Sequence, residues 1–240
     1  MRPDICYDLR NRAGQQQRIP LHLHPDDHSL QVPADFEAPH WARLEYHQCS
    51  HCPLSQDEYR DCPVARNLAW LLPDHELGPS HERIDLRVDA HQRRYQMETS
   101  LQRALGSLFG LVCALSDCPH TRFLRPMALF HLPVSNETET LVRTASLYLL
   151  QRYIAHRHDP AIPVDLDELN EQYRQLNVLN RCFVERFRGR QSDAPVNAMV
   201  LLQVLSRDMK GELNELLESL APLFDTGDAG AAITEPPGND

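Results

Sequence analysis

The stretch His47-Gln48-Cys49-Ser50-His51-Cys52-Pro53, followed by Cys62-Pro63, decides how the chain is expected to fold. It holds three of the seven cysteines at the spacing C-x2-C-x9-C, and Cys118-Pro119 can supply a fourth. Thiolates that converge on one point are held there by a soft metal ion such as zinc. The sequence therefore predicts a tetrahedral structural zinc site whose ligands are Cys49, Cys52, Cys62 and Cys118.

Three other interpretations of these cysteines stay open. The same four thiolates could hold a 4Fe-4S cluster, because prolines are common after cluster ligands and one follows Cys52, Cys62 and Cys118. Cys49 and Cys52 could form a dithiol redox pair, or the thiols could be unliganded and packed as small apolar groups. In a metal site a histidine could replace one cysteine; the candidates are His47, His51, His120 and His131.

The composition is that of a globular protein and argues against two kinds of partner. Hydrophobic residues make up 42% of the chain and charged residues 24%. The net charge is -10, whereas nucleic-acid binding needs a basic face. No apolar run approaches the ~20 residues of a membrane-spanning helix, and no signal segment is visible. We therefore expect a cytoplasmic protein, in which clustered cysteines serve metal or redox chemistry.

The first 98 residues are predicted to form the mainly β part of the chain. Residues 4–32 are expected to form a hairpin, and Pro20 places its second strand at a sheet edge because proline lacks an N–H. Residues 41–46 alternate in polarity and are predicted to form a short strand that leads into the cysteine loop. With strands at 82–89 and 93–97, about five short antiparallel strands are expected.

Helices are predicted where apolar residues recur at helical spacing. Pro63 is expected at the first position of a short helix, which makes Cys62 its N-cap. Thr99 and Asp165 are predicted to cap two longer helices, and Asn136 opens a capping-box pattern. The helix after Asn136 is apolar nearly all round, so we expect it at the centre of a bundle. The last two helices are predicted to form a hairpin.

The fold class expected from these elements is α+β, with a small antiparallel sheet and a zinc-knuckle-like cysteine loop packed on a C-terminal helical bundle. The boundaries are 1–98 for the mainly β part, 99–224 for the helical part and 225–240 for a disordered acidic tail. Cys118 follows the first long helix, while the other three ligands lie in the mainly β part. Zinc would therefore join the two parts.

No motif in the sequence identifies an enzyme. We find no glycine-rich phosphate loop, no G-x-S-x-G elbow and no H-E-x-x-H pair. The pair Arg93-Arg94 and the arginines between positions 181 and 190 could bind an anion. Positive charge near the C-terminus of a helix needs no ligand, however, because it interacts favourably with the helix dipole. The question of catalysis stays open, and a non-enzymatic role is favoured.

Several short segments resemble other proteins. They are Leu108-Phe109-Gly110-Leu111, Cys118-Pro119-His120, the Phe-Leu-Arg-Pro-Met-Ala run at 123–128 and the Phe-His-Leu-Pro run at 130–133. The pattern, over residues 41–155, is similar to that of uncharacterised bacterial proteins with no assigned role. This resemblance implies no activity, cofactor or site residue.

The predicted function is that of a non-enzymatic, cytoplasmic zinc-binding protein with a regulatory role exerted through protein–protein contacts. The reason is a closed thiolate site without recognisable catalytic residues, since such a site has no open position for a substrate. The partner surface is expected on the C-terminal helical hairpin, through which the chain could also form a homo-oligomer. The alternative is a redox protein, either an iron–sulfur sensor or a Cys49–Cys52 dithiol switch.

Overall fold

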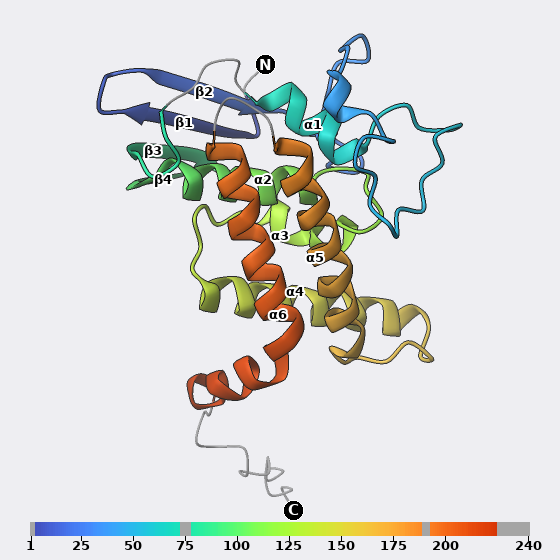
Figure 1. Ribbon diagram of the computed structural model, residues 1–240. Coiled ribbons are helices and arrows are strands. Elements are labelled where there is room, and N and C mark those ends of the chain that lie inside the picture. The colour runs from blue at the N-terminus through green and yellow to red at the C-terminus, as the bar shows by residue number, and fades with distance from the viewer. Residues whose placement is uncertain (1–2, 73–77, 189–192, 225–240) are drawn as a thin grey trace, which may run out of the picture.

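The computed structural model describes residues 3–72, 78–188 and 193–224, except for the side chains of residues 210–212 and 214. Figure 1 shows a small sheet at one end of the molecule and two long antiparallel helices that run away from it. The fold class is α+β, as the sequence predicted. The predicted tail, residues 225–240, lies outside the described residues.

Four antiparallel strands form one sheet in the order β2-β1-β3-β4. Their bounds are Ile5–Asn11 for β1, Gln16–Leu21 for β2, Arg83–Ala90 for β3 and Arg93–Ser100 for β4. The predicted hairpin is confirmed, and Pro20 lies in the edge strand β2, where a missing N–H is tolerated. Burial alternates along β3, so one face of the sheet belongs to the core and the other carries charged residues.

The segment that leads into the cysteine loop does not form the predicted strand. His40–Ala42 is a 3₁₀ helix, η1, and a single bridge joins Arg43 to Asp61. The alternation in the sequence arises because Ala42 and Leu44 are buried while their neighbours are more exposed. Alternating polarity therefore reports burial on one side of the segment, and burial alone does not supply a strand partner.

Helix α2, Leu101–Ala114, packs against the buried face of the sheet. The hydroxyl of Tyr7 in β1 lies 2.9 Å from Ser107 Oγ in α2. The predicted cap at Thr99 is wrong, because β4 continues through Ser100 and the helix begins at Leu101. Helix α6, Ala194–Phe224, packs on another side of α2, where a Cβ added to Gly106 would lie 3.5 Å from the carbonyl oxygen of Ala198.

Helix α5, Asp167–Phe187, and α6 form the predicted hairpin and lie side by side in Figure 1. The predicted cap at Asp165 is wrong by one position, since the N-cap is Leu166 and it makes no side-chain hydrogen bond. Asp165 Oδ1 instead accepts a hydrogen bond of 3.2 Å from the N–H of Asp167. The first turn of α5 is thus supported by a neighbour of its N-cap residue.

Helix α4, Glu137–His158, begins with the predicted capping box but is less buried than predicted. Asn136 Oδ1 accepts from the N–H of Glu139, and the Glu139 carboxylate accepts from the N–H of Asn136, both at 2.8 Å. In the second half of the helix, Leu150, Tyr153 and Ile154 are 52%, 50% and 51% exposed. The helix is therefore not central in a bundle, because an all-round apolar composition does not determine which neighbours cover it.

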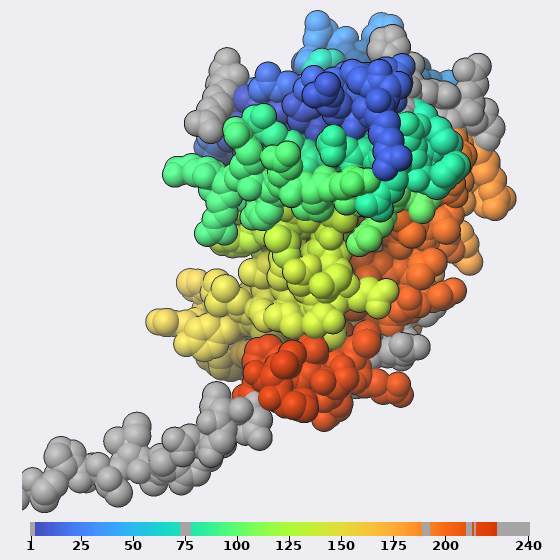
Figure 2. All heavy atoms as spheres, turned by 90° about the vertical axis from the view of Figure 1, so that its left-hand side faces the viewer, coloured from blue at the N-terminus to red at the C-terminus, as the bar shows by residue number. Residues whose placement is uncertain are grey.

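The remaining elements are short: α1 is Pro63–Leu71, η2 is Arg122–Leu124 and α3 is Arg125–Leu129. Figure 2 shows the strands at the top of that view, α3 and α4 beneath them and α6 along one side. A single hydrophobic core runs from the sheet through α2 into the hairpin, while the division at residue 98 stays a prediction. No helix among residues 3–72, 78–188 and 193–224 has the length and apolar character to cross a membrane.

Candidate functional site

Two of the four predicted ligands are buried at helix ends. Cys62 is the N-cap of α1, as predicted, and is 8% exposed. Cys118 follows α2, is 5% exposed, and its N–H donates to Ser116 Oγ at 3.3 Å. Burial is the main cause that raises the pKa of Cys118 to about 12, and the thiols of Cys62 and Cys52 raise it as well. Cys52, Cys62 and Cys118 therefore lie within electrostatic reach of one another.

The other two predicted ligands lie on the half-buried loop after η1. The N–H of Cys52 donates to the carbonyl oxygen of Cys49 at 3.0 Å, which closes a tight turn. The thiol of Cys49 forms a hydrogen bond with Cys182 of α5. This bond lowers the pKa of Cys182 to about 6 and, with burial, raises the pKa of Cys49. Cys182 therefore also lies beside the cysteine loop, although the sequence did not predict it as a ligand.

Sequence reasoning missed Cys182 because it is far along the chain from every other cysteine. A weak signal was present: Cys182 follows Leu179 by three positions and directly precedes Phe183, both of which belong to the buried seam of α5. Side chains three positions apart share one side of a helix. The seam places Cys182 at the edge of the core, but no local pattern says that the loop of Cys49 packs there.

The thiols gather, yet they are not arranged as a finished metal centre. Among the residues that the structure describes, no three His, Cys, Asp or Glu side chains form a group that could hold a metal ion. The zinc-knuckle-like loop and the zinc site at Cys49, Cys52, Cys62 and Cys118 therefore stay predictions. A physical reason for the spread is that thiols attract one another only weakly, whereas a bound cation draws thiolates together.

The candidate histidines occupy different places. His51 and His120 stack with ring centroids 4.0 Å apart, and His120 Nε2 lies 3.0 Å from the carbonyl oxygen of His51. Burial, and then the charge of His120, lower the pKa of His51. His47 meets the ring of the preceding tyrosine edge to face. His131 belongs to another network, since its Nε2 lies 2.6 Å from the hydroxyl of Tyr7. Only His51 and His120 are therefore paired beside the cysteine loop.

A buried arginine connects α5 to the segment before the cysteine loop. Arg186 is 2% exposed, and its guanidinium donates to three carbonyl oxygens, those of Trp41 at 2.8 Å, Arg43 at 2.9 Å and Leu44 at 3.2 Å. Its Nε has no hydrogen-bond partner in the described part of the chain. The sequence suggested a charge at a helix end; instead, this arginine is a core residue.

The charge of Arg186 acts on the cysteines. Burial raises the pKa of Cys62, and the charge of Arg186 opposes that rise. No ion pair within the described ranges includes Arg186. The guanidinium therefore lies in the core with neutral acceptors only, and the nearby thiols are the groups that can become anions.

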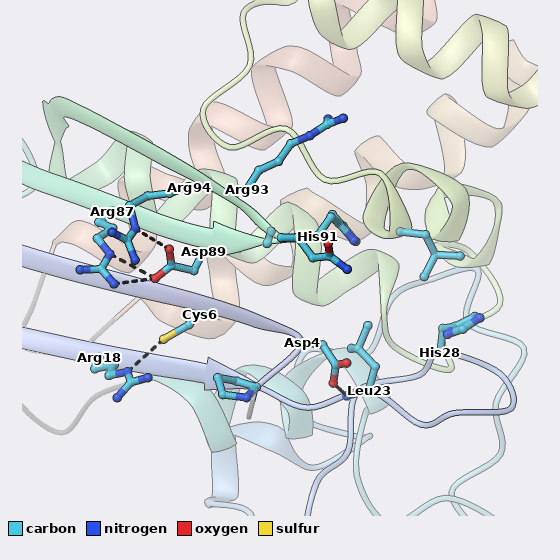
Figure 3. A pocket seen from close by; sticks show the side chains of 14 residues that line it. Asp4, Cys6, Arg18, Leu23, His28, Arg87, Asp89, His91, Arg93 and Arg94 are labelled. Carbon is cyan, nitrogen blue, oxygen red and sulfur yellow. Dashed lines mark hydrogen bonds and ion pairs between the residues drawn. The ribbon is translucent and has the colours of Figure 1, made fainter. Parts of the chain in front are cut away.

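A second candidate site is a cavity of about 920 Å³ at the edge and outer face of the sheet. Figure 3 shows Arg87 and Arg94 pointing at Asp89, while Arg93 points away from it. The ion pairs measure 2.8 Å for Arg87 and 2.7 Å for Arg94. Hydrogen bonds from Arg94 and then Arg87 lower the pKa of Asp89. The anion site suggested at Arg93-Arg94 is weakened, because a carboxylate already compensates Arg94.

Comparison with known proteins identifies a family and nothing more specific. No curated protein and no solved structure matches the chain. A family model described as "Domain of unknown function (DUF6901)" matches residues 5–225. The match extends beyond residues 41–155, which carry the resemblance to uncharacterised proteins. The chain therefore belongs to the family described as Domain of unknown function (DUF6901).

Proposed function

We propose that the cysteine cluster binds a zinc ion and that the protein acts in regulation through protein contacts rather than catalysis. The ligands would be Cys49, Cys52, Cys62 and Cys118. The observation that carries the proposal is the buried charge of Arg186, which forms no ion pair among the described residues and acts on the thiol of Cys62. A buried cation is costly without an anion nearby, and four thiolates on Zn²⁺ carry a net charge of about -2.

Binding would require the loop to close on the two buried cysteines. The ends of the loop are tied together, because the N–H of Leu44 donates to Arg60 at 3.1 Å and the N–H of Cys62 donates to Ala42 at 2.8 Å. Between these ties the N–H of Cys52 donates to the carbonyl oxygen of Cys49, so the two cysteines would move towards Cys62 together as one turn. A zinc ion would then join the loop to the ends of α1 and α2 and stabilise their contact.

The surface for protein contacts would lie on the C-terminal helical hairpin. Leu223 and Phe224 at the end of α6 are 73% and 64% exposed. Exposed large apolar side chains that lie together are typical of contact sites. A second copy of the chain is one candidate partner. The test is the mass of the protein in solution, which should be that of an oligomer in the wild type and lower in the double variant Leu223→Ser, Phe224→Ser.

A thiol switch is the second candidate function, and the contact between Cys49 and Cys182 favours it. Hydrogen peroxide would oxidise this pair, in place of the Cys49–Cys52 pair that the sequence suggested. The Cys182 thiolate would attack one peroxide oxygen and break the O–O bond, giving a sulfenic acid and a hydroxide that takes up a proton to become water. The Cys49 thiol would then attack the sulfenic sulfur, form the disulfide and release a second water. Two thiols lose two electrons, and one peroxide becomes two waters.

The test is the metal content of the full-length protein, purified under reducing conditions without metal-affinity resin. We expect about one zinc per chain, because a closed four-thiolate site holds one ion. Cys118→Ser should lose most of the zinc. Cys6→Ser is the control, since Cys6 lies on the sheet, where its Sγ accepts a hydrogen bond of 3.2 Å from Arg18. Zinc and iron both absent would refute every metal proposal.

Two further results separate the alternatives. A brown protein that absorbs at about 400 nm would identify a 4Fe-4S cluster on the same thiolates. A Cys49–Cys182 disulfide, found by peptide mapping after mild peroxide treatment of metal-free protein, would support the thiol switch. Cys182→Ser should prevent that disulfide and leave the zinc content unchanged if zinc is held by the four predicted ligands.

A further inference from the structure

A cavity of about 690 Å³ lies between α2, α6 and the chain from Leu124 to Arg143. Its walls include none of the four predicted zinc ligands. Eleven of its 28 lining residues are Ala, Val or Leu, among them Leu111, Leu124, Leu132, Leu176, Leu202 and Leu205, and polar residues line much of the rest. Small-molecule sites in proteins commonly have volumes of roughly 300–1,000 Å³ and mostly apolar walls. The cavity thus has the size of a ligand site, and its leucines supply an apolar part of the wall.

The cavity is open to solvent on the side of α6. Leu201 and Val204 line it and are also 38% and 39% exposed. On the α2 side, Gly110 contributes no side chain, and a Cβ there would lie 3.6 Å from Leu202. An apolar molecule could therefore enter without first unfolding a helix, and its entry would remove exposed leucine and valine surface from water.

Arg143, a half-buried cation in the wall, forms no ion pair with any residue that the structure describes. Two arginines of α4 show the contrast: Arg152 pairs with the carboxylate of Glu168 at 3.0 Å. Arg143 donates only to neutral carbonyl oxygens, those of Met127 at 2.9 Å and Phe130 at 2.7 Å. Burial lowers the pKa of Arg143, so its charge is incompletely compensated.

The other charged groups near the cavity do not supply an anion for Arg143. Arg103 and Glu137 line the cavity and are both exposed. The charge of Glu139 opposes the lowering of the Arg143 pKa, but the Glu139 carboxylate accepts the N–H of Asn136 at 2.8 Å as part of the capping box. A ligand with one negative charge would therefore complete the surroundings of Arg143.

The wall around Val134 is held by a polar network that joins β1 and α2 to the segment between α3 and α4. Ser107 Oγ accepts the N–H of Val134 at 2.9 Å and lies 2.9 Å from the hydroxyl of Tyr7, which lies 2.6 Å from His131 Nε2. This network holds Val134 at φ 54, a conformation that β-branched residues rarely adopt. Such outliers cluster at ligand sites, and here the outlier shapes the cavity wall.

We infer that this cavity binds a medium-chain fatty acid, with its hydrocarbon chain among the leucines and its carboxylate at Arg143. A carboxylate accepts charge-assisted hydrogen bonds from a guanidinium, and these are stronger than bonds to neutral acceptors. A monoanion fits better than a phosphate dianion, because Arg143 is the one half-buried cation among the described lining residues.

The test is calorimetric titration of the full-length protein with decanoate and with decan-1-ol, which has the same chain length and no charge. We expect saturable decanoate binding at about one molecule per chain, weakened about tenfold or more by Arg143→Gln, where tenfold corresponds to ~1.4 kcal/mol. The glutamine amide can still donate to a wall carbonyl. Binding of decan-1-ol should be unchanged by this substitution. Arg152→Gln is the matched control and should bind both ligands as the wild type does.

A second variant tests the location independently of Arg143. Val204→Trp places a bulky ring at the solvent-exposed wall, where the 39% exposure of Val204 leaves room for it. This substitution should weaken the binding of both decanoate and decan-1-ol. The inference would be overturned if the wild-type protein showed no saturable binding of decanoate. It would also be overturned if the Arg143→Gln variant, with a circular dichroism spectrum like that of the wild type, bound decanoate as tightly as the wild type does. Either result is independent of the metal content.

Discussion

Arg186 Nη1 donates a hydrogen bond of 2.8 Å to the carbonyl oxygen of Trp41, which ties the C-terminal helical hairpin to the segment before the cysteine loop. The same nitrogen reaches the carbonyl oxygen of Arg43 at 2.9 Å. Segments that are 145 positions apart in the chain therefore meet at one buried guanidinium. This contact places α5, and with it Cys182, against the loop that carries Cys49.

Replacing Arg186 should destabilise the protein strongly. We expect Arg186→Met to lower the free energy of unfolding by about 2–4 kcal/mol, because buried carbonyl oxygens lose their donors. Urea unfolding followed by circular dichroism measures the change. Arg188→Gln, at the C-cap of the same helix, removes an exposed arginine that pairs with Glu185 and should cost less than ~1 kcal/mol. Equal losses in the two variants would contradict the structural role of Arg186.

Acid should destabilise the protein partly through His131. Burial lowers the pKa of His131 from 6.5 to about 3, so the folded protein keeps it neutral where the unfolded chain takes up a proton. Stability is therefore lost as the pH falls from about 6.5 towards 3, by up to ~1.4 kcal/mol per pH unit. His131→Gln should remove this contribution, so its free energy of unfolding should fall less steeply with falling pH than that of the wild type. Urea unfolding between pH 7 and about 4.5 measures the two slopes.

The control for His131 is His158→Gln, a change at an exposed residue at the end of α4. It should retain the pH dependence of the wild type. The same slope in His131→Gln and wild-type protein would show that His131 is not the buried neutral group responsible.

The capping box of α4 should contribute measurably to stability. Asn136→Ala removes the acceptor for the N–H of Glu139 and should cost about 1 kcal/mol, whereas Asn136→Gly should cost only about a few tenths. Thermal unfolding of both variants measures the difference. If alanine and glycine had the same effect, the N-cap would not be the source of the stabilisation.

The ion pairs around Asp89 should contribute a small, salt-dependent stabilisation. Hydrogen bonds from Arg94 and Arg87 lower the pKa of Asp89, so their contribution is present above its ordinary pKa and lost on acidification through the lowered value. Asp89→Asn should cost about 0.5–1 kcal/mol at low salt and less at ~1 M salt, where screening is strong. Asp85→Asn, on the same strand but outside the ion pairs of the described residues, should show no such salt dependence.

Predictions from local pattern succeeded where neighbours along the chain decide the structure. The capping box at Asn136 needs only a residue three positions away, and the N-cap position of Cys62 follows from the proline after it. The predicted strand at 41–46 failed because a strand needs a partner, and alternation cannot show whether one is near. The cap at Thr99 failed because β4 extends further than its apolar pattern.

The amino-acid sequence by itself determined the α+β class, most helices and strands, and the concentration of cysteines around residues 49–62. Only the tertiary structure decided that Arg186 is buried, that Cys182 meets Cys49, and that Arg143 lines a cavity in which none of the described residues forms an ion pair with it. The physical reason is range. Helical and strand periodicities arise between residues close in the chain, whereas these contacts join segments whose mutual packing no local pattern encodes.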